Sequence, residues 1–230
     1  TGIEIAIIEL LIFFICAYRI KQSYFILTNI NCIVYYWVML TILTGIWEFS
    51  FITNYDNVNN ISRSLIESKS HVWTNQYGIL SILPWNLAYI FYAEYGAYAD
   101  REYMAIKDDW SKVIEGSHAI LCALFSLLCI VYKIRRNDRS YLVSISIAMG
   151  CQLMNSILYL MNYFIQCNEP FNVNYNTSSF PTGNFLSKRG FMYVNIFWFI
   201  MPSYVIIDLL MNKKNIDNID NIEYLKLPKQ

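Results

Sequence analysis

Long apolar stretches alternate with short polar segments along the whole chain. Five of these stretches approach or exceed the about 20 residues that a helix needs to cross a bilayer. They cover residues 3–18, 24–51, 113–132, 141–165 and 191–211. The pattern therefore predicts an all-α polytopic membrane protein, with a bundle of five transmembrane helices in residues 1–214. Residues 215–230 are polar, and we expect them to form a loosely ordered C-terminal tail.

Two further segments lie between the second and third apolar stretches. Residues 54–70 are rich in Asn and Ser and predict coil, whereas residues 79–98 are apolar and aromatic, with Pro84 near their start. A sixth span is the alternative for residues 79–98, but a proline interrupts them and aromatic residues dominate them. We favour a helix that lies in the membrane interface or caps the bundle, within an aromatic-rich outer loop.

Basic residues gather in three of the polar connections. The clusters are Arg19 and Lys21; Lys133, Arg135, Arg136 and Arg139; and Lys213 and Lys214. With five crossings, all three clusters share one side of the membrane. Since cytoplasmic loops carry the excess of Lys and Arg, the N-terminus is expected outside and the C-terminus inside.

The composition supports a membrane protein and excludes several classes. The 230 residues are 56% hydrophobic and only 15% charged, outside the usual soluble range, and a net charge of zero excludes nucleic acid as a partner. Six cysteines have no paired spacing, so we expect small apolar packing residues, no metal site and no cofactor. The chain does not begin with Met, and we expect its N-terminus to be incomplete or processed.

Ionisable side chains inside the apolar stretches are the candidate catalytic groups. Glu48 lies near the outer end of the second span, and Glu115 and His118 lie near the outer end of the third. Three residues separate Glu115 from His118, which puts both on one helix face. Because a charge at membrane depth needs a partner or a use, these three residues are nominated as a functional site. Glu9, in the first span, is expected to face other helices.

Polar and aromatic residues of the spans are candidates for ligand binding. They are Thr44, Trp47, Gln152, Asn155, Tyr159, Asn195 and Trp198. Carboxylates and aromatic faces attract positive charge, so this set suits a cationic ligand or a carbocation intermediate. An imidazole beside carboxylates can also move protons on an apolar substrate. The alternative is that these groups only form hydrogen bonds between helices.

The fifth span carries the pattern Asn195-x2-Trp198-x3-Pro202-x5-Asp208, which resembles the last helix of the emopamil-binding proteins. These are the sterol Δ8-Δ7 isomerases of the EXPERA superfamily. In the fourth span, Gln152 followed by Leu158-Tyr159 is similar to the family's Gln-x6-Tyr segment, although Asn155-Ser156 stands where the family usually has Gly-Asp.

Similar elements precede the third span. Glu94-Tyr95 and residues 100–103 resemble the family's Glu-Tyr and Asp-Ser-Arg-Tyr elements, and Asp109-Trp110 leads toward Glu115 as in the family. The resemblance implies a divergent member with five transmembrane helices in the endoplasmic reticulum membrane; another organelle membrane, such as the mitochondrial inner membrane, is the alternative.

The resemblance also implies roles for individual residues. Glu48 and Glu115 match the family's two acids, Asn195 its amide and Trp198 its cation-facing aromatic residue. The family's catalytic His, four residues before the first acid, is Thr44 here. A hydroxyl titrates far outside the useful range and cannot replace an imidazole.

Three hypotheses for function follow. The favoured one is an emopamil-binding-like protein whose cavity takes a sterol or an amphipathic amine without isomerising it. In the second, the chain is an active sterol isomerase in which His118 has taken over proton transfer and works with Glu115. In the third, it is a structural accessory subunit of a larger membrane complex. Membrane lipids are expected partners in every case, and a homodimer remains open.

Overall fold

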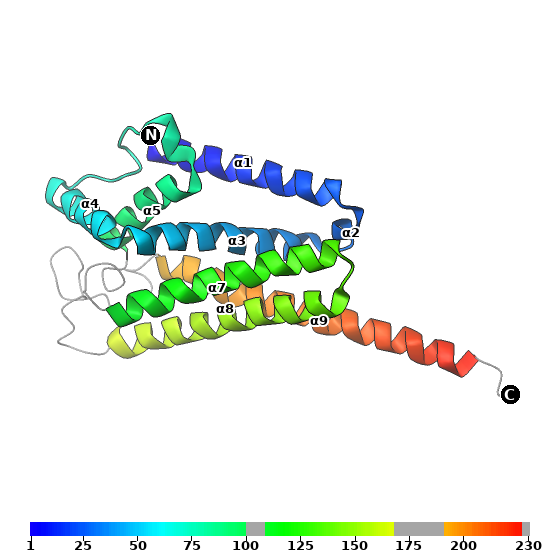
Figure 1. Cartoon of the computed structure of the whole chain (residues 1–230). Helices are drawn as coiled ribbons and strands as arrows, with labels where there is room; N and C mark the ends of the chain where they lie inside the picture. The colour runs from blue at the N-terminus through cyan, green and yellow to red at the C-terminus, as the bar shows by residue number, and fades with distance from the viewer. Residues whose placement is uncertain (100–108, 168–190, 227–230) are drawn as a thin grey trace.

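The computed structural model describes residues 1–99, 109–167 and 191–226 (Figure 1). These residues are predominantly helical, and no strand occurs among them. The helices α3 (Cys32–Thr53), α7 (Asp109–Ile134), α8 (Asp138–Cys167) and α9 (Phe191–Lys226) form a bundle in which each packs against the next. The predicted all-α class is therefore confirmed for the described parts of the chain.

Four helical segments in the described ranges are long and apolar enough to cross a membrane. They are Cys32–Thr53, Gly116–Ile134, Asp138–Met161 and Tyr193–Met211. Each of them overlaps one of the last four predicted spans, with ends that differ by a few residues in most cases. The first predicted span forms α1 (Gly2–Ser23), which is long enough but carries four charged side chains and is not among the four. A fifth crossing therefore stays a prediction, although α1 runs alongside the bundle in Figure 1.

The second predicted span begins later than the apolar pattern indicated. A single turn, α2 (Phe25–Thr28), is separated from α3, which starts at Cys32. The side-chain oxygen of Asn31 accepts the Ile33 amide at 3.0 Å and caps α3. The prediction of one helix from residue 24 is wrong because this cap satisfies free amide groups and favours a helix start at Cys32.

Residues 54–70, predicted as coil, instead form α4 (Tyr55–Ser68). Tyr55, Val58 and Leu65 recur at helical spacing and are buried, so burial of one apolar face overrides the Asn-rich and Ser-rich composition. Then follow η1 (Ile79–Ile82) and α5 (Pro84–Tyr98), which begins with the proline. Pro suits this position because the first amides of a helix lack partners.

Helices α4, η1 and α5, with the loop 69–78, form what we call the outer cap. Helix α5 packs against α3 and α4, and the cap lies at one end of the bundle (Figure 1). The turn between α7 and α8 lies at the opposite end, as does the end of α1 that carries Arg19 and Lys21. These two basic clusters therefore share one end of the molecule, as predicted from the charge pattern.

Helix α9 does not end near residue 211 as predicted but continues to Lys226. Isoleucines recur every three residues in this stretch, at Ile216, Ile219 and Ile222. A three-residue spacing is compatible with a helix, and the polar composition of the tail obscured this periodicity.

Helices α3 and α7 approach each other closely at two glycines. A Cβ atom added at Gly45 would lie 2.1 Å from the Cβ of Ala123, and one added at Gly116 would lie 1.9 Å from Cδ1 of Ile52. Small residues let helix backbones approach each other in membranes in this way. The contact also brings the backbone of α7 close to Glu48 on α3.

Candidate functional site

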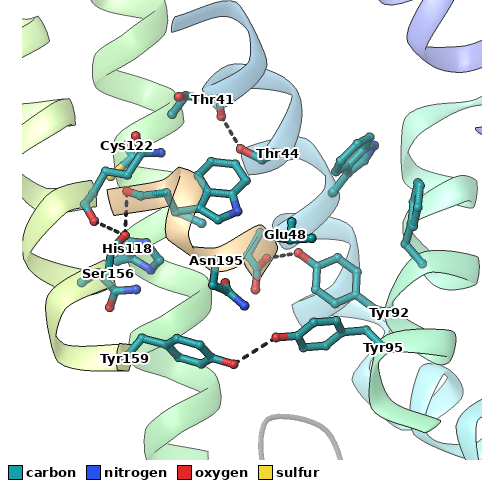
Figure 2. Close-up of a pocket in the computed structure, with 17 residues that line it drawn as sticks. Thr41, Thr44, Glu48, Tyr92, Tyr95, His118, Cys122, Ser156, Tyr159 and Asn195 are labelled. Atoms are coloured by element: carbon teal, nitrogen blue, oxygen red, sulfur yellow. Dashed lines mark hydrogen bonds between the residues drawn. The ribbon is translucent and has the colours of Figure 1, made fainter. Parts of the chain in front are cut away.

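A cavity of about 360 Å³ lies between α3, α5, α7, α8 and α9 (Figure 2). Its lining residues are Thr41, Thr44, Trp47, Glu48, Phe91, Tyr92, Tyr95, His118, Ala119, Cys122, Gln152, Asn155, Ser156, Tyr159, Val194, Asn195 and Trp198. The volume falls within the range of about 300–1,000 Å³ that small-molecule sites occupy. Most of the lining groups are apolar or aromatic, with polar groups interspersed.

Nine of the ten residues nominated from the sequence line this cavity. They are Glu48, His118 and all seven ligand-binding candidates. The tenth, Glu115, belongs to α7 and precedes Gly116, but its side chain lies outside the described residues. The structure therefore brings together side chains from four helices that are far apart in the sequence.

Glu48 provides a buried carboxylate in the wall of the cavity. Its side chain is 7% exposed, and it accepts a hydrogen bond from the hydroxyl of Tyr92 on α5 (Figure 2). The Tyr92 ring stacks on Phe51 with centroids 4.5 Å apart, which orients the hydroxyl. Because burying a carboxylate without hydrogen bonds is unfavourable, Tyr92 stabilises the charge that Glu48 presents to the cavity.

Thr44 lies one turn before Glu48 on α3. Its hydroxyl donates to the backbone carbonyl of Thr41 at 3.0 Å, so the hydroxyl proton is held within the same helix. This local bond is common for threonine in helices. Thr44 thus contributes an oxygen and a methyl group to the cavity but no acid or base.

His118 enters the cavity from α7. Its side chain is half-buried, and Figure 2 shows it in the same space as Glu48 of α3 and Asn195 of α9. The arrangement places an imidazole and a carboxylate from different helices in the lining of one cavity. Such a pair can bind a cation or exchange a proton with a molecule held between them.

A network of hydrogen bonds holds the wall formed by α8 and α9. The indole nitrogen of Trp37 donates to the Gln152 side-chain oxygen at 2.8 Å, and its ring lies 5.0 Å from that of Trp198. The Ser156 hydroxyl lies 2.9 Å from the Gln152 carbonyl oxygen and 2.8 Å from that of Trp198. For Gln152, the structure therefore shows the helix-to-helix bond that the sequence left as the alternative.

Three residues of α5 that the sequence did not nominate also line the cavity. They are Phe91, Tyr92 and Tyr95. The hydroxyl of Tyr95 lies 3.0 Å from that of Tyr159 on α8, which joins the outer cap to the bundle (Figure 2). Tyr92 and Tyr95 are three residues apart and share a helix face, so their spacing could have indicated that both hydroxyls point toward the same part of the bundle. The sequence predicts residues 79–98 as a helix in the interface or capping the bundle, and none of them as a site residue.

Glu94 lies on α5 but serves the outer cap rather than the cavity. One carboxylate oxygen lies 2.6 Å from Nδ1 of His71, and the other accepts the Val72 amide at 3.0 Å. Tyr98 packs its ring on His71 and donates to two backbone carbonyl oxygens at 2.8 Å. Burial and the charge of Glu94 raise the pKa of Tyr98, which keeps the phenol protonated as a donor. These contacts fasten the loop 69–78.

Glu9 joins α1 to the rear of the cavity wall. Its side chain is 3% exposed, and one carboxylate oxygen accepts the indole N–H of Trp47 at 3.1 Å. The other oxygen has no hydrogen-bond partner among the described residues. The prediction that Glu9 faces another helix is therefore confirmed.

The cysteines fit the predicted packing role only in part. Cys122 and Cys129 are buried in the bundle, whereas Cys16 and Cys32 are exposed on α1 and α3. Among the described residues, no three His, Cys, Asp or Glu side chains gather in a group that can hold a metal ion.

The chain matches no protein-family model, no curated protein and no solved structure. The resemblance to emopamil-binding proteins therefore stays a prediction based on the residues quoted above. The structure itself defines a helical protein with four helices able to cross a membrane and a cavity between its helices.

Proposed function

We propose that the chain is an integral membrane protein whose cavity binds a sterol or an amphipathic amine, as an emopamil-binding-like protein that does not isomerise its ligand. One observation carries the proposal: a cavity of about 360 Å³ gathers nine nominated residues, among them the buried Glu48. The family resemblance supports the same ligand class and an endoplasmic reticulum membrane.

The lining suits a ligand with one polar or cationic end and an apolar body. Glu48 attracts a positive group, and the faces of Trp47 and Trp198 add attraction through their π electrons. Carbon-rich side chains such as Phe91 and Val194 provide contact for the apolar part.

The absence of isomerase activity in this proposal rests on Thr44. Its hydroxyl is donated to Thr41 and does not titrate near neutral pH, so it supplies no proton to a double bond. Binding then depends on attraction and fit rather than on acid and base catalysis.

Equilibrium binding of a radiolabelled amphipathic tertiary amine to detergent-purified protein tests the proposal. We expect saturable binding that weakens about tenfold in Glu48→Gln, because the variant loses a charged partner worth about 1.4 kcal/mol. Glu67→Gln removes an exposed carboxylate on α4 and serves as the matched control. Unchanged affinity in Glu48→Gln, or binding that does not saturate, contradicts the proposal.

The second candidate is an active sterol Δ8-Δ7 isomerase, and the observation that favours it is His118 in the same cavity as Glu48. The imidazolium would protonate one alkene carbon, leaving a carbocation on its neighbour that Glu48 and Trp198 stabilise. Loss of a proton from the next carbon to the imidazole would form the new double bond and restore the imidazolium. Glu115 is assigned to the same cation by resemblance alone.

Incubation of purified protein with a Δ8-sterol decides between the two candidates. Mass spectrometric detection of the Δ7 isomer, abolished in His118→Ala and Glu115→Gln, would establish the isomerase. Amine binding without any Δ7 product supports the binding protein. Recovery of the chain only in a stoichiometric complex, with neither binding nor turnover, would favour the accessory subunit instead.

A further inference from the structure

A second hollow, which we call the α1 groove, lies between α1, α3 and α9. It has a volume of about 410 Å³ and shares no lining residue with the first cavity. Apolar side chains dominate it, among them Phe14 of α1, Ile33, Tyr36 and Leu40 of α3, and Met201 of α9. The α3 residues belong to the first turns of that helix, so the groove lies in the half of the bundle that faces away from the outer cap.

The basic side chain of Lys21 is buried near the start of α3. It is 8% exposed, and its Nζ lies 3.3 Å from the Ile30 carbonyl oxygen and 5.1 Å from the centroid of the Tyr35 ring. Among the described residues, no carboxylate forms an ion pair with it. Burial of an ammonium group with one carbonyl and one ring leaves much of its charge uncompensated, so an additional anion would be stabilising.

A chain of aromatic contacts connects Lys21 with the α1 groove. The ring of Tyr35, which Lys21 covers, lies 5.3 Å from that of Tyr36, and the Tyr36 ring lies 5.9 Å from that of Phe14. Tyr36 and Phe14 both line the groove. Arg19, two residues before Lys21 on α1, is exposed at the same end. A buried cation is therefore linked to an apolar groove through neighbouring aromatic rings, at the basic end of the molecule.

We propose that the α1 groove binds one acyl chain of an anionic phospholipid, with the phosphate of that lipid beside Lys21. The apolar lining accepts the chain, and Lys21 provides the complementary charge for the headgroup. A zwitterionic phospholipid has the same acyl chains, but its headgroup also carries a positive charge, so we expect it to bind less tightly beside Lys21. The site is independent of the proposed function, because it shares no residue with the cavity around Glu48.

Native mass spectrometry tests the proposal. The full chain is reconstituted in bilayers of equal parts phosphatidylglycerol and phosphatidylcholine, then released into mild detergent, and the retained lipids are counted. We expect phosphatidylglycerol to be retained in preference to phosphatidylcholine. Lys21→Gln should lower that ratio about fivefold, as expected for loss of one cation at a lipid headgroup. Lys21→Arg, which keeps the charge, should preserve it.

Two further variants separate the site from general surface charge. Arg135→Gln removes an exposed cation at the same end of the molecule, outside the groove, and should leave the ratio unchanged. Ile33→Trp places a bulky side chain in the groove and should reduce retention of both lipids, even if Lys21→Gln fails to fold. Equal effects of Arg135→Gln and Lys21→Gln, or full retention in Ile33→Trp, would overturn the proposal.

Discussion

Helix α3 has two apolar neighbours, α7 and α1, that meet it in different ways. Toward α7 it presents Gly45, and the backbones come so close that an added Cβ atom would collide with Ala123. Toward α1 it presents larger side chains such as Tyr36 and Leu40, and a groove of about 410 Å³ remains. Apolar composition alone therefore does not decide how closely two membrane helices pack; the size of the facing residues does.

Helix α1 is attached at separate points instead. Near its start, a Cβ atom at Gly2 would meet the Val72 carbonyl oxygen at 2.4 Å, which shows close contact with the outer cap. Along its length Glu9 accepts the Trp47 indole N–H, and near its end the Ala17 carbonyl accepts the Tyr35 hydroxyl at 2.7 Å. Separate contacts thus hold α1 along its length, whereas continuous packing holds α7.

The largest effect is expected from Gly45→Ala, which breaks the close contact between α3 and α7. The added methyl group meets Ala123 at 2.1 Å, and we expect the free energy of unfolding to fall by about 3 kcal/mol. Thermal unfolding in detergent, followed by near-ultraviolet circular dichroism, measures the change.

Gly150→Ala is the matched control for this prediction. It adds the same methyl group in α8, where nothing lies within 4 Å, and should leave stability unchanged or raise it by up to about 1 kcal/mol. Adding Ala123→Gly to Gly45→Ala should recover part of the loss, because it removes the colliding atom. Equal stability of the two single glycine variants would show that α3 and α7 do not approach as described.

An intermediate effect is expected from Glu94→Gln, which destabilises the loop 69–78 that contacts the start of α1. The variant loses the charged partner of His71 and of the Val72 amide, and we expect a loss of about 2 kcal/mol. Hydrogen exchange measured by mass spectrometry should become faster in the loop 69–78 and in the first turns of α1. Glu67→Gln, on the exposed face of α4, should leave both segments unchanged.

The smallest effect is expected from Trp47→Phe, which removes the hydrogen bond between α3 and Glu9. We expect a loss of about 1 kcal/mol, the usual contribution of one such bond, with faster exchange along α1 but not along α7. Trp85→Phe changes an indole that is 50% exposed and is the control. If hydrogen exchange in α7 rose as much as in α1, the attachment of α1 to α3 and the packing of α7 on α3 would not be independent.

Sequence patterns located the candidate site well on four helices because each apolar span contained few polar residues to choose from. Glu48 and His118 stood out as ionisable groups in apolar surroundings, and Asn195 and Trp198 through the family resemblance. Tyr92 and Tyr95 were missed because aromatic residues are ordinary at a membrane interface and their direction depends on how α5 docks.

The errors in helix boundaries have local causes. Asn31 caps the N-terminus of α3 seven residues after the apolar stretch begins. Helix α4 forms because Tyr55, Val58 and Leu65 are buried within the outer cap. In both cases a few side-chain contacts override average composition. The prediction of coil for residues 54–70 failed because composition contains no information on which helix face will be buried.

The sequence by itself determined the helical class, four of the predicted membrane-length segments and the end of the molecule that carries Arg19 and Lys133. These depend on the length of apolar runs and on the position of charges, which are local properties. Only the tertiary structure decided that α5 contributes to the cavity around Glu48, that α1 leaves a groove beside α3, and that Lys21 is buried against Ile30 and Tyr35. These features depend on helix rotation and closest approach, which side chains from distant parts of the chain set together.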